Sequence, residues 1–339
     1  MHMKVLIIGA GGMIGRKLSE RLVREGRVAG RSIDEMTLVD VTEPTGMKPT
    51  RVEPTGRGGP TVKLVTRALD FTAKGAAVRL IDDRPDIIFH LAAIVSGEAE
   101  SDFEKGYRIN VDGTRDLFEA IRKAQAADGY RPRVIFASSI AVFGAPFPSV
   151  IPDSFHSTPL TSYGTQKAIG ELLLTDYTRR GFMDGIGIRL PTIVIRPGRP
   201  NKAASGFFSN ILREPINGQE AVLPVSEDVR HWFASPRAAV EFFVHAAGLD
   251  PDAVGPHRNL NMPGLSTTVG EEIEALGRVM GADVPKLIRR EPDEAIRRIV
   301  QNWATGFEPS RARTLGFRAE TSFDEIIRVY LEDELGTGA

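Results

Sequence analysis

The fold of this chain is decided by the stretch Lys4-Val5-Leu6-Ile7-Ile8-Gly9-Ala10-Gly11-Gly12-Met13-Ile14-Gly15-Arg16. Its apolar run, residues 5–8, is typical of a central parallel strand that is buried on both faces. The glycines Gly9, Gly12 and Gly15 are spaced G-x-x-G-x-x-G. The first permits a tight turn, the second lets a pyrophosphate approach the backbone, and the third lets the next helix pack closely on the strand. Because the free N–H groups of that helix face the turn, the stretch predicts a dinucleotide site.

A second apolar strand, residues 36–39, ends at Asp40. An acidic side chain at this place accepts hydrogen bonds from an adenosine ribose and repels a 2′-phosphate. The sequence therefore favours NAD over NADP as the cofactor. The alternative is a glycine-rich turn that binds nothing, and the order of strand, turn, helix and acid argues against it.

The composition agrees with a globular enzyme and excludes several other classes. The chain has 339 residues, an apolar content of 42% and a net charge of −1, so nothing in its charge favours nucleic acid or an anionic membrane. It has no cysteine, which excludes disulfides and thiolate chemistry. No apolar run approaches the length of about 20 residues that spans a bilayer, and no signal peptide is visible. We expect a cytoplasmic protein.

The alternation of short apolar strands with helices predicts an α/β fold, a doubly wound parallel sheet of the Rossmann type. Strands ending at Gly9, Asp40, Ala92 and Ser139 should converge on one crevice, because ligands of such sheets bind beyond the carboxyl ends of the strands. We expect an NAD-binding domain over residues 1–190 and a smaller substrate domain over residues 191–339, with segments around 229–262 returning to the sheet. A Pro/Gly-rich surface loop is expected at 43–60.

Tyr163 and Lys167 lie four residues apart, on one face of a predicted helix, downstream of Ser138-Ser139. An ammonium at this spacing would lower the pKa of the phenol, which could then act as a general base toward a substrate hydroxyl. An exposed pair on a helix surface is the alternative. The glycine-rich turn in the same chain favours the catalytic interpretation.

With both motifs placed, the chain resembles the extended short-chain dehydrogenase/reductase superfamily, which includes the NAD-dependent epimerase/dehydratase family. The resemblance is carried by Gly9–Gly15, Asp70, Phe89-His90-Leu91-Ala92-Ala93, Asn110-Val111-Asp112-Gly113-Thr114, Ser138-Ser139, Tyr163, Lys167 and Arg189-Leu190-Pro191. It implies that Asp70 and Phe71 flank the adenine and that Asn110 orders the active-site helix. It also implies that Ser139, Tyr163 and Lys167 are catalytic. The implied cofactor-binding residues are Gly9, Gly12, Met13, Ile14, Gly15, Asp40, Asp70, Phe71, Leu91, Ala92, Ala93, Asn110, Ser138, Tyr163, Lys167, Pro191 and Ile193.

Several further stretches are similar to the D-erythronate dehydrogenase family: residues 160–167, 185–200, 213–215, 228–232 and 307–317. That similarity implies NAD-dependent oxidation of the C2 hydroxyl of a four-carbon sugar acid. Sugar-nucleotide epimerases usually carry an asparagine where this chain has Pro191-Thr192. This departure weakens a nucleotide-sugar interpretation without excluding it.

A sugar acid needs a cation for its carboxylate, and the presumed substrate domain offers Arg196, Arg199, Lys202 and Arg230. Asn201 and Ser205 could bind hydroxyls, and the superfamily often places a substrate contact at Ser96. The predicted substrate-binding residues are Ser96, Ser139, Tyr163, Arg196, Asn201 and Arg230. His231 and Trp232 are expected to be packing residues. No histidines have zinc-ligand spacing, so no metal is predicted.

Three functions remain open from the sequence. The first is an NAD-dependent dehydrogenase of a small hydroxy acid, D-erythronate or a close relative. The second is a nucleoside-diphosphate-sugar 4-epimerase or dehydratase, which would show no net redox change. The third is a non-catalytic NAD(H)-sensing module, against which Ser139, Tyr163 and Lys167 argue. The resemblance also implies a homodimer that pairs the helices holding Phe118 and Leu172.

Overall fold

The computed structural model describes residues 3–45, 62–198 and 205–336. Its centre is a seven-stranded sheet in the order β13-β9-β7-β6-β1-β4-β5, in which every pair of neighbours is parallel. The strands are β1 (Lys4–Ile8), β4 (Glu35–Asp40), β5 (Lys63–Ala68), β6 (Ile87–His90), β7 (Arg133–Ser139), β9 (Asp184–Leu190) and β13 (Asn259–Asn261). The strand order reverses at β1, so the predicted doubly wound sheet is confirmed.

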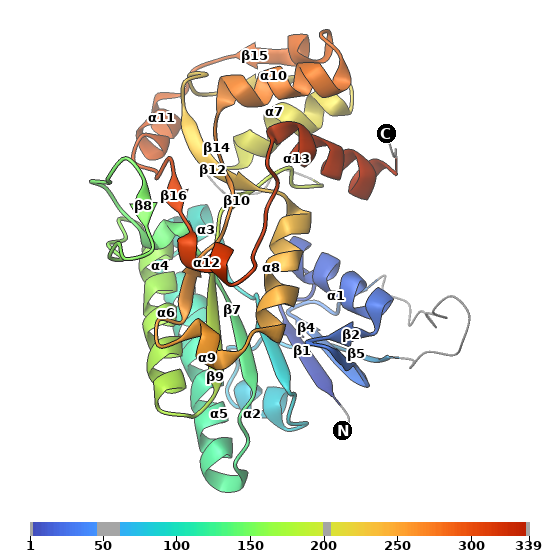
Figure 1. Cartoon of the computed structure of the whole chain (residues 1–339), viewed down its shortest axis with the longest axis vertical. Helices are drawn as coiled ribbons and strands as arrows, with labels where there is room; N and C mark the ends of the chain where they lie inside the picture. The colour runs from blue at the N-terminus through green and yellow to red at the C-terminus, as the bar shows by residue number, and fades with distance from the viewer. Residues whose placement is uncertain (1–2, 46–61, 199–204, 337–339) are drawn as a thin grey trace.

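Helices cover both faces of this sheet (Figure 1). On one face, α1 (Met13–Glu25) and α8 (Pro236–Gly248) share an apolar core with the strands. On the other face lie α2 (Ala76–Ile81), α5 (Gly113–Asp128) and α6 (Ser162–Arg179), which form a second core. Because both faces are covered, the central strands are continuous apolar runs rather than alternating ones.

The C-terminal half supplies a smaller lobe with a core of its own, at the top of Figure 1. It contains a three-stranded sheet, β10 (Thr192–Ile193), β12 (Arg230–Ala234) and β14 (Leu265–Thr268), and a pair of strands, β11 (Ala221–Leu223) and β15 (Ile288–Arg290). Its helices are α7 (Gly206–Ile216), α10 (Val269–Met280), α11 (Glu294–Val300) and α13 (Phe323–Tyr330). The lobe lies beyond the carboxyl ends of β1, β6, β7 and β9.

The chain passes between the two halves several times. It enters the lobe after β9, returns with α8, α9 (Pro251–Val254) and β13, and leaves again at β14. It comes back with β16 (Phe307–Glu308), which pairs with β8 (Ile151–Pro152), and with α12 (Ser310–Thr314), before α13 ends in the lobe. The segment 229–262 thus contributes a strand that pairs with β9. The boundary at residue 190 stays a prediction.

The remaining elements are short: a hairpin of β2 (Arg27–Val28) and β3 (Arg31–Ser32), the helices α3 (Ser96–Ser101) and α4 (Phe103–Gly106), and a π-helical turn, Tyr107–Asp112, that runs into α5. Short turns also occur at Ile140–Val142, Val284–Leu287 and Leu331–Leu335. The sequence did not predict the hairpin. The loop expected at 43–60 lies mostly outside the described residues.

Two observations concern partners. Leu172 on α6 is 72% exposed, whereas Phe118 on α5 has no exposed surface and belongs to the core, so it cannot form part of a contact face. The homodimer stays a prediction. Within residues 3–45, 62–198 and 205–336, no helix is long and apolar enough to cross a membrane.

Candidate active site

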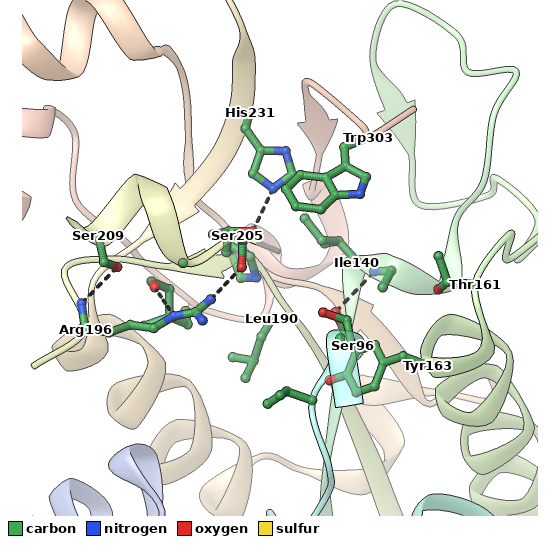
Figure 2. Close-up of a pocket in the computed structure, with 18 of the residues that line it drawn as sticks. Ser96, Ile140, Thr161, Tyr163, Leu190, Arg196, Ser205, Ser209, His231 and Trp303 are labelled. Carbon is green, nitrogen blue, oxygen red and sulfur yellow. Dashed lines mark hydrogen bonds between the residues drawn. The ribbon is translucent and has the colours of Figure 1, made fainter. Parts of the chain in front are cut away.

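A cavity of about 1170 Å³ lies where the sheet meets the C-terminal lobe. Figure 2 shows that residues from both halves turn their side chains into it. From the sheet come, among others, Gly9, Gly12, Met13, Ile14, Gly15, Leu91, Ser96, Ser138, Ser139 and Tyr163. From residues 190 onward come, among others, Pro191, Thr192, Ile193, Arg196, Ser205, Ser209, Arg213, His231 and Trp303. The two predicted motifs therefore meet in one space.

The glycine-rich turn forms one end of the cavity. A side chain at Gly15 would place its Cβ 2.1 Å from the carbonyl oxygen of Gly9, so only glycine lets α1 approach β1 this closely. The N-terminus of α1, at Met13, is thereby directed at the cavity. A helix N-terminus behind a glycine turn binds phosphate through its free N–H groups, so these residues fit the pyrophosphate of a dinucleotide.

Asp40 lies beside this turn, at the end of β4. One of its carboxylate oxygens accepts a hydrogen bond from the Gly11 N–H at 2.8 Å. This contact holds a negative charge next to the turn, where an adenosine ribose is expected.

The two residues predicted to flank an adenine differ in accessibility. Asp70 is exposed, and its carboxylate accepts hydrogen bonds from the N–H and hydroxyl of Thr72, which lower its pKa. Phe71 is only 5% exposed, and its ring packs edge-on against His90 in the core. Because that ring is already enclosed, we leave the Phe71 side chain out of the proposed cofactor site.

Asn110 is a buried support behind the cavity rather than part of its wall. Asn110 accepts a hydrogen bond from the Ile94 N–H at 3.0 Å and donates one to the Gln166 side chain at 2.7 Å. It thus ties the segment after β6 to α6, the ordering role that the family resemblance implies. Among the described residues that line the cavity, Leu91 is present but Ala92 and Ala93 are not.

Local packing at the start of α6 positions Tyr163. The hydroxyl of Thr161 caps the helix by accepting a hydrogen bond from the Gly164 N–H at 3.0 Å. A Cβ at Gly164 would lie 2.1 Å from the Ala141 carbonyl oxygen, so glycine is needed for α6 to pack on the turn that follows Ser139. This packing brings Tyr163 close enough to Ser139 for the serine hydroxyl to lower the pKa of the phenol by hydrogen bonding.

The electrostatics of Tyr163 differ from the expectation. Burial raises the pKa of Tyr163 to about 12, against smaller lowering effects of the Ser139 hydrogen bond and the Arg196 charge. The ammonium of Lys167 lies 5.7 Å from the centre of the Tyr163 ring and donates to the Ala137 carbonyl at 2.8 Å. The expected lowering of the phenol pKa by Lys167 is therefore not seen in the protein alone. Desolvation of the buried phenol outweighs the effect of the nearby charges.

Lys167 belongs to a buried polar network behind Tyr163. Burial lowers the pKa of Lys167 to about 8, and the charge of Glu171 opposes this shift. Glu171 is held by Arg189 through two hydrogen bonds of 2.8 and 2.7 Å, and it accepts a third from the Ser138 hydroxyl at 2.6 Å. This network fixes α6, which carries Tyr163, against the carboxyl ends of β7 and β9.

Arg196, in the loop after β10, is the cation that reaches the cavity near Tyr163. Figure 2 shows it fixed by its own segment: its guanidinium donates to the Ile193 carbonyl at 2.9 Å and to the Ser205 hydroxyl at 3.0 Å. Its backbone N–H donates to the Ser209 hydroxyl at 3.1 Å. Among the described residues no carboxylate pairs with it, and burial lowers its pKa. A desolvated guanidinium in this position attracts an anion.

The structure does not bring the other predicted cation to the cavity. Arg230 lies on β12 with its guanidinium donating to the Ser266 carbonyl at 2.9 Å and pairing with the half-exposed Glu271. Successive residues of a strand face opposite sides, so the same strand turns the next residue, His231, into the cavity instead. Ser96 does line the cavity. Asn201 lies outside the described residues, as do Arg199 and Lys202.

Sequence reasoning missed the polar and aromatic residues that the lobe contributes. His231 was expected to be a packing residue. Both of its ring nitrogens form hydrogen bonds, one with the Thr192 hydroxyl at 2.7 Å and one with the Ala304 carbonyl at 3.0 Å. Trp303 lies over it in Figure 2, with ring centroids 5.1 Å apart. Trp232 is buried, as expected. The period-two alternation along 230–232 indicated only that Arg230 and His231 face opposite sides of the strand.

Comparisons with known proteins agree with this geometry. The model of the NAD dependent epimerase/dehydratase family matches residues 5–253. The chain is 43% identical over 335 residues to the D-erythronate dehydrogenase of Cupriavidus necator, with 98% of both chains covered. It is 40% identical to the D-erythronate dehydrogenase of Haemophilus influenzae over 98% of this chain and 100% of that one.

Solved structures give the same architecture. A crystal structure described as the nucleoside-diphosphate-sugar epimerase from Agrobacterium tumefaciens is 64% identical, with a TM-score of 0.92 over 99% of this chain and 95% of that one. A UDP-glucose 4-epimerase of Thermus thermophilus in complex with NAD has a TM-score of 0.73 at 20% identity, a likeness of fold alone, over 99% of this chain and 100% of that one. The matches confirm the prediction of an NAD-dependent enzyme of the dehydrogenase type. This chain belongs to the NAD dependent epimerase/dehydratase family.

Proposed function

We propose that this protein oxidises the C2 hydroxyl of a small sugar acid, D-erythronate or a close relative, to the 2-keto acid with NAD. The full-length similarity to two proteins named D-erythronate dehydrogenase supports this choice of substrate. Pro191-Thr192, which stands where sugar-nucleotide epimerases usually carry asparagine, supports it as well.

One observation carries the proposal. The Arg196 guanidinium has no carboxylate partner among the described residues, and its charge acts on Tyr163 in the same cavity. A planar guanidinium that is held rigidly by neighbouring oxygens binds a carboxylate through two parallel hydrogen bonds. A carboxylate on Arg196 would therefore leave the adjacent carbinol carbon of a 2-hydroxy acid next to Tyr163 and Ser139.

The proton chemistry falls to these two residues. The Ser139 hydroxyl accepts a hydrogen bond from the Ala141 N–H at 3.2 Å and lies beside Tyr163, so its hydrogen can turn from the phenol to the reacting oxygen and hold that oxygen near the phenol. Tyr163, as phenolate, takes the proton of the C2 hydroxyl. When bound, NAD supplies the hydride acceptor and a positive charge beside the phenol.

Lys167 and Asp40 would hold the cofactor. The ammonium of Lys167 uses one of its three N–H groups on the Ala137 carbonyl, so two remain for ribose hydroxyls. The carboxylate of Asp40 keeps acceptor capacity beyond its bonds to the Gly11 and Val41 N–H groups, and it opposes a 2′-phosphate by its charge. These features support NAD as the cofactor.

The test is a direct assay with the purified protein and NAD. D-Erythronate, its uncharged lactone and a nucleotide sugar are supplied in parallel, and NADH is followed by its absorbance. We expect NADH with the acid alone. NADH formation from the lactone at the same rate would contradict the role given to Arg196.

A nucleoside-diphosphate-sugar 4-epimerase is the second candidate. The name of the Agrobacterium relative supports it. Interconversion of a nucleotide sugar without release of NADH, together with no reaction of the acid, would favour this candidate over ours.

A further inference from the structure

His231 is held in one tautomer by its neighbours. Its Nδ1 lies 3.0 Å from the Ala304 carbonyl oxygen, which can only accept a hydrogen bond. The hydrogen of a neutral ring must therefore be on Nδ1, and Nε2 carries a lone pair. Nε2 lies 2.7 Å from the hydroxyl of Thr192, so the hydroxyl is the donor in that contact.

The ring stays neutral at physiological pH. Burial lowers the pKa of His231 to about 4, the charge of Arg196 lowers it further, and the bond to Ala304 only partly opposes these effects. Aromatic neighbours also fix the plane of the ring. Phe208 stacks on it with ring centroids 5.4 Å apart, and Trp303 lies on it with centroids 5.1 Å apart. The ring cannot turn without disturbing both contacts.

Thr192 consequently offers the cavity lone pairs and no hydrogen. It lines the cavity, and His231 is its side-chain hydrogen-bond partner among the described residues. Arg196, which lines the same cavity, has the opposite character, because a guanidinium can only donate. A substrate hydroxyl can therefore donate its hydrogen to Thr192, whose own hydrogen is already engaged by His231.

We propose that Thr192, oriented by His231, accepts a hydrogen bond from a substrate hydroxyl beyond the reacting carbon and thereby selects polyhydroxylated acids over their deoxy analogues. The inference rests on the proposed function. Arg196 would bind the carboxylate of any small acid, whereas Thr192 would distinguish acids by the hydroxyl group at C3 or C4.

The experiment compares substrates and variants together. D-Erythronate and the two analogues that lack its C3 or its C4 hydroxyl are assayed by kcat/KM with the parent, Thr192→Val and Thr192→Ser. The parent should prefer D-erythronate to one of the analogues by about 10²-fold or more, as expected for a site built around a substrate hydroxyl.

Thr192→Val keeps the shape of the side chain and removes the acceptor. It should lower kcat/KM for D-erythronate by about tenfold to a hundredfold, the usual effect of a lost hydrogen bond to a buried polar group, and leave the discriminated analogue unchanged. Thr192→Ser keeps the hydroxyl and should retain the parent's selectivity. An equal loss on all three acids, or no loss, would overturn the inference, because a merely structural role does not distinguish the substrates.

His231→Phe tests the orienting step separately, since a phenyl ring preserves the stacking on Phe208 but accepts nothing from Thr192. Selectivity for D-erythronate should fall in the same direction as in Thr192→Val. Unchanged selectivity in this variant would overturn the role given to His231. If the parent reduces NAD with none of the three acids, the proposed function itself is wrong, a result that is distinct from turnover without selectivity.

Discussion

The two walls of the cavity are built in different ways. The wall on the sheet side comes from strand ends and from one helix, and its reacting groups lie within local motifs: Ser139 ends β7, and Tyr163 and Lys167 are one turn apart on α6. The wall on the lobe side is assembled from short segments far apart in the sequence. Thr192 lies on β10 and Arg196 in the loop that follows it. His231 lies on β12, and Trp303 lies in the segment after α11.

This difference separates two tasks. The sheet-side wall carries the proton chemistry, which is the same for any hydroxyl that NAD can oxidise. The lobe-side wall carries groups that distinguish substrates, a guanidinium for a carboxylate and an oriented acceptor for a hydroxyl. Changes in the first wall should therefore affect kcat with every substrate, and changes in the second should act on KM and on selectivity.

The sharpest test of the sheet-side wall is Tyr163→Phe. We expect turnover to fall by about 10²–10⁴-fold with NAD affinity nearly unchanged, because a positioned general base contributes about that much. Steady-state kinetics and NAD titration measure the two effects. Tyr177→Phe is the matched control on the same helix, since Tyr177 bonds Glu119 away from the cavity. Comparable turnover in the two variants would remove Tyr163 from the mechanism.

The lobe-side wall is tested by Arg196→Ala. A lost charge-assisted contact costs about 2–5 kcal/mol, so KM for the acid should rise strongly while NAD affinity is kept. Arg230→Ala is the control, because Arg230 sits in a half-exposed pair with Glu271. If Arg230→Ala raised KM as much as Arg196→Ala, the assignment of the carboxylate to Arg196 would be wrong.

Cofactor choice should follow Asp40 alone and be independent of the lobe. The parent should use NAD far better than NADP, and Asp40→Asn should reduce this preference by about tenfold to a hundredfold, mainly through better use of NADP, since like charges at short range cost several kcal/mol. The ratio of kcat/KM with NAD to kcat/KM with NADP measures this preference. Glu35→Gln, at the other end of β4, should keep the parent's ratio. A parent that used NADP as well as NAD would contradict the placement of the ribose.

The smallest expected effect comes from a second difference between the two halves: a buried carboxylate is paired in one half and unpaired in the other. Glu171 is paired with Arg189 behind the sheet-side wall, whereas Glu272 in the lobe has no exposed surface and no hydrogen-bond partner for either oxygen in the part of the chain that the structure describes. Burial raises the pKa of Glu272 well above its usual 4.5. An acid whose folded pKa is raised stabilises the fold below its unfolded pKa, and this stability is lost as the pH rises through the folded pKa.

Glu272→Gln stays neutral at every pH and should match the parent at about pH 4 but exceed it by about 1–3 kcal/mol at about pH 8, the range expected for an unpaired buried polar group. Urea denaturation at the two pH values measures the difference. Glu274→Gln, an exposed position on the same helix, should be neutral at both. Equal stabilities of parent and Glu272→Gln at both pH values would show that Glu272 has a partner.

The sequence predicted best those features that depend on neighbours along the chain. The glycine turn, the strand ending at Asp40 and the spacing of Tyr163 and Lys167 are local, and each is present in the structure. The direction of the Tyr163 pKa was not predictable, because it depends on how much protein surrounds the phenol.

The lobe was harder to predict, because its arrangement also depends on contacts between residues that are far apart in the sequence. Arg230 and His231 are adjacent, and only the pairing of β12 between β10 and β14 decides which one faces the cavity. Phe71 looks like a cofactor contact by its place after β5, but the core closes over its ring. The tautomer of His231 depends on Ala304, which lies 73 residues away in the sequence.

The repeated passage of the chain between the halves limits how substrate range can change. A cut after Leu190 would carry β13 away from the sheet and α8 away from its face, because both follow residues of the lobe along the chain. The lobe therefore cannot be exchanged as a cassette at a single junction, and recombination with a relative would have to respect all of its returns. New specificities on this scaffold should arise by single replacements at cavity positions such as Thr192, while the sheet and its cofactor chemistry stay intact.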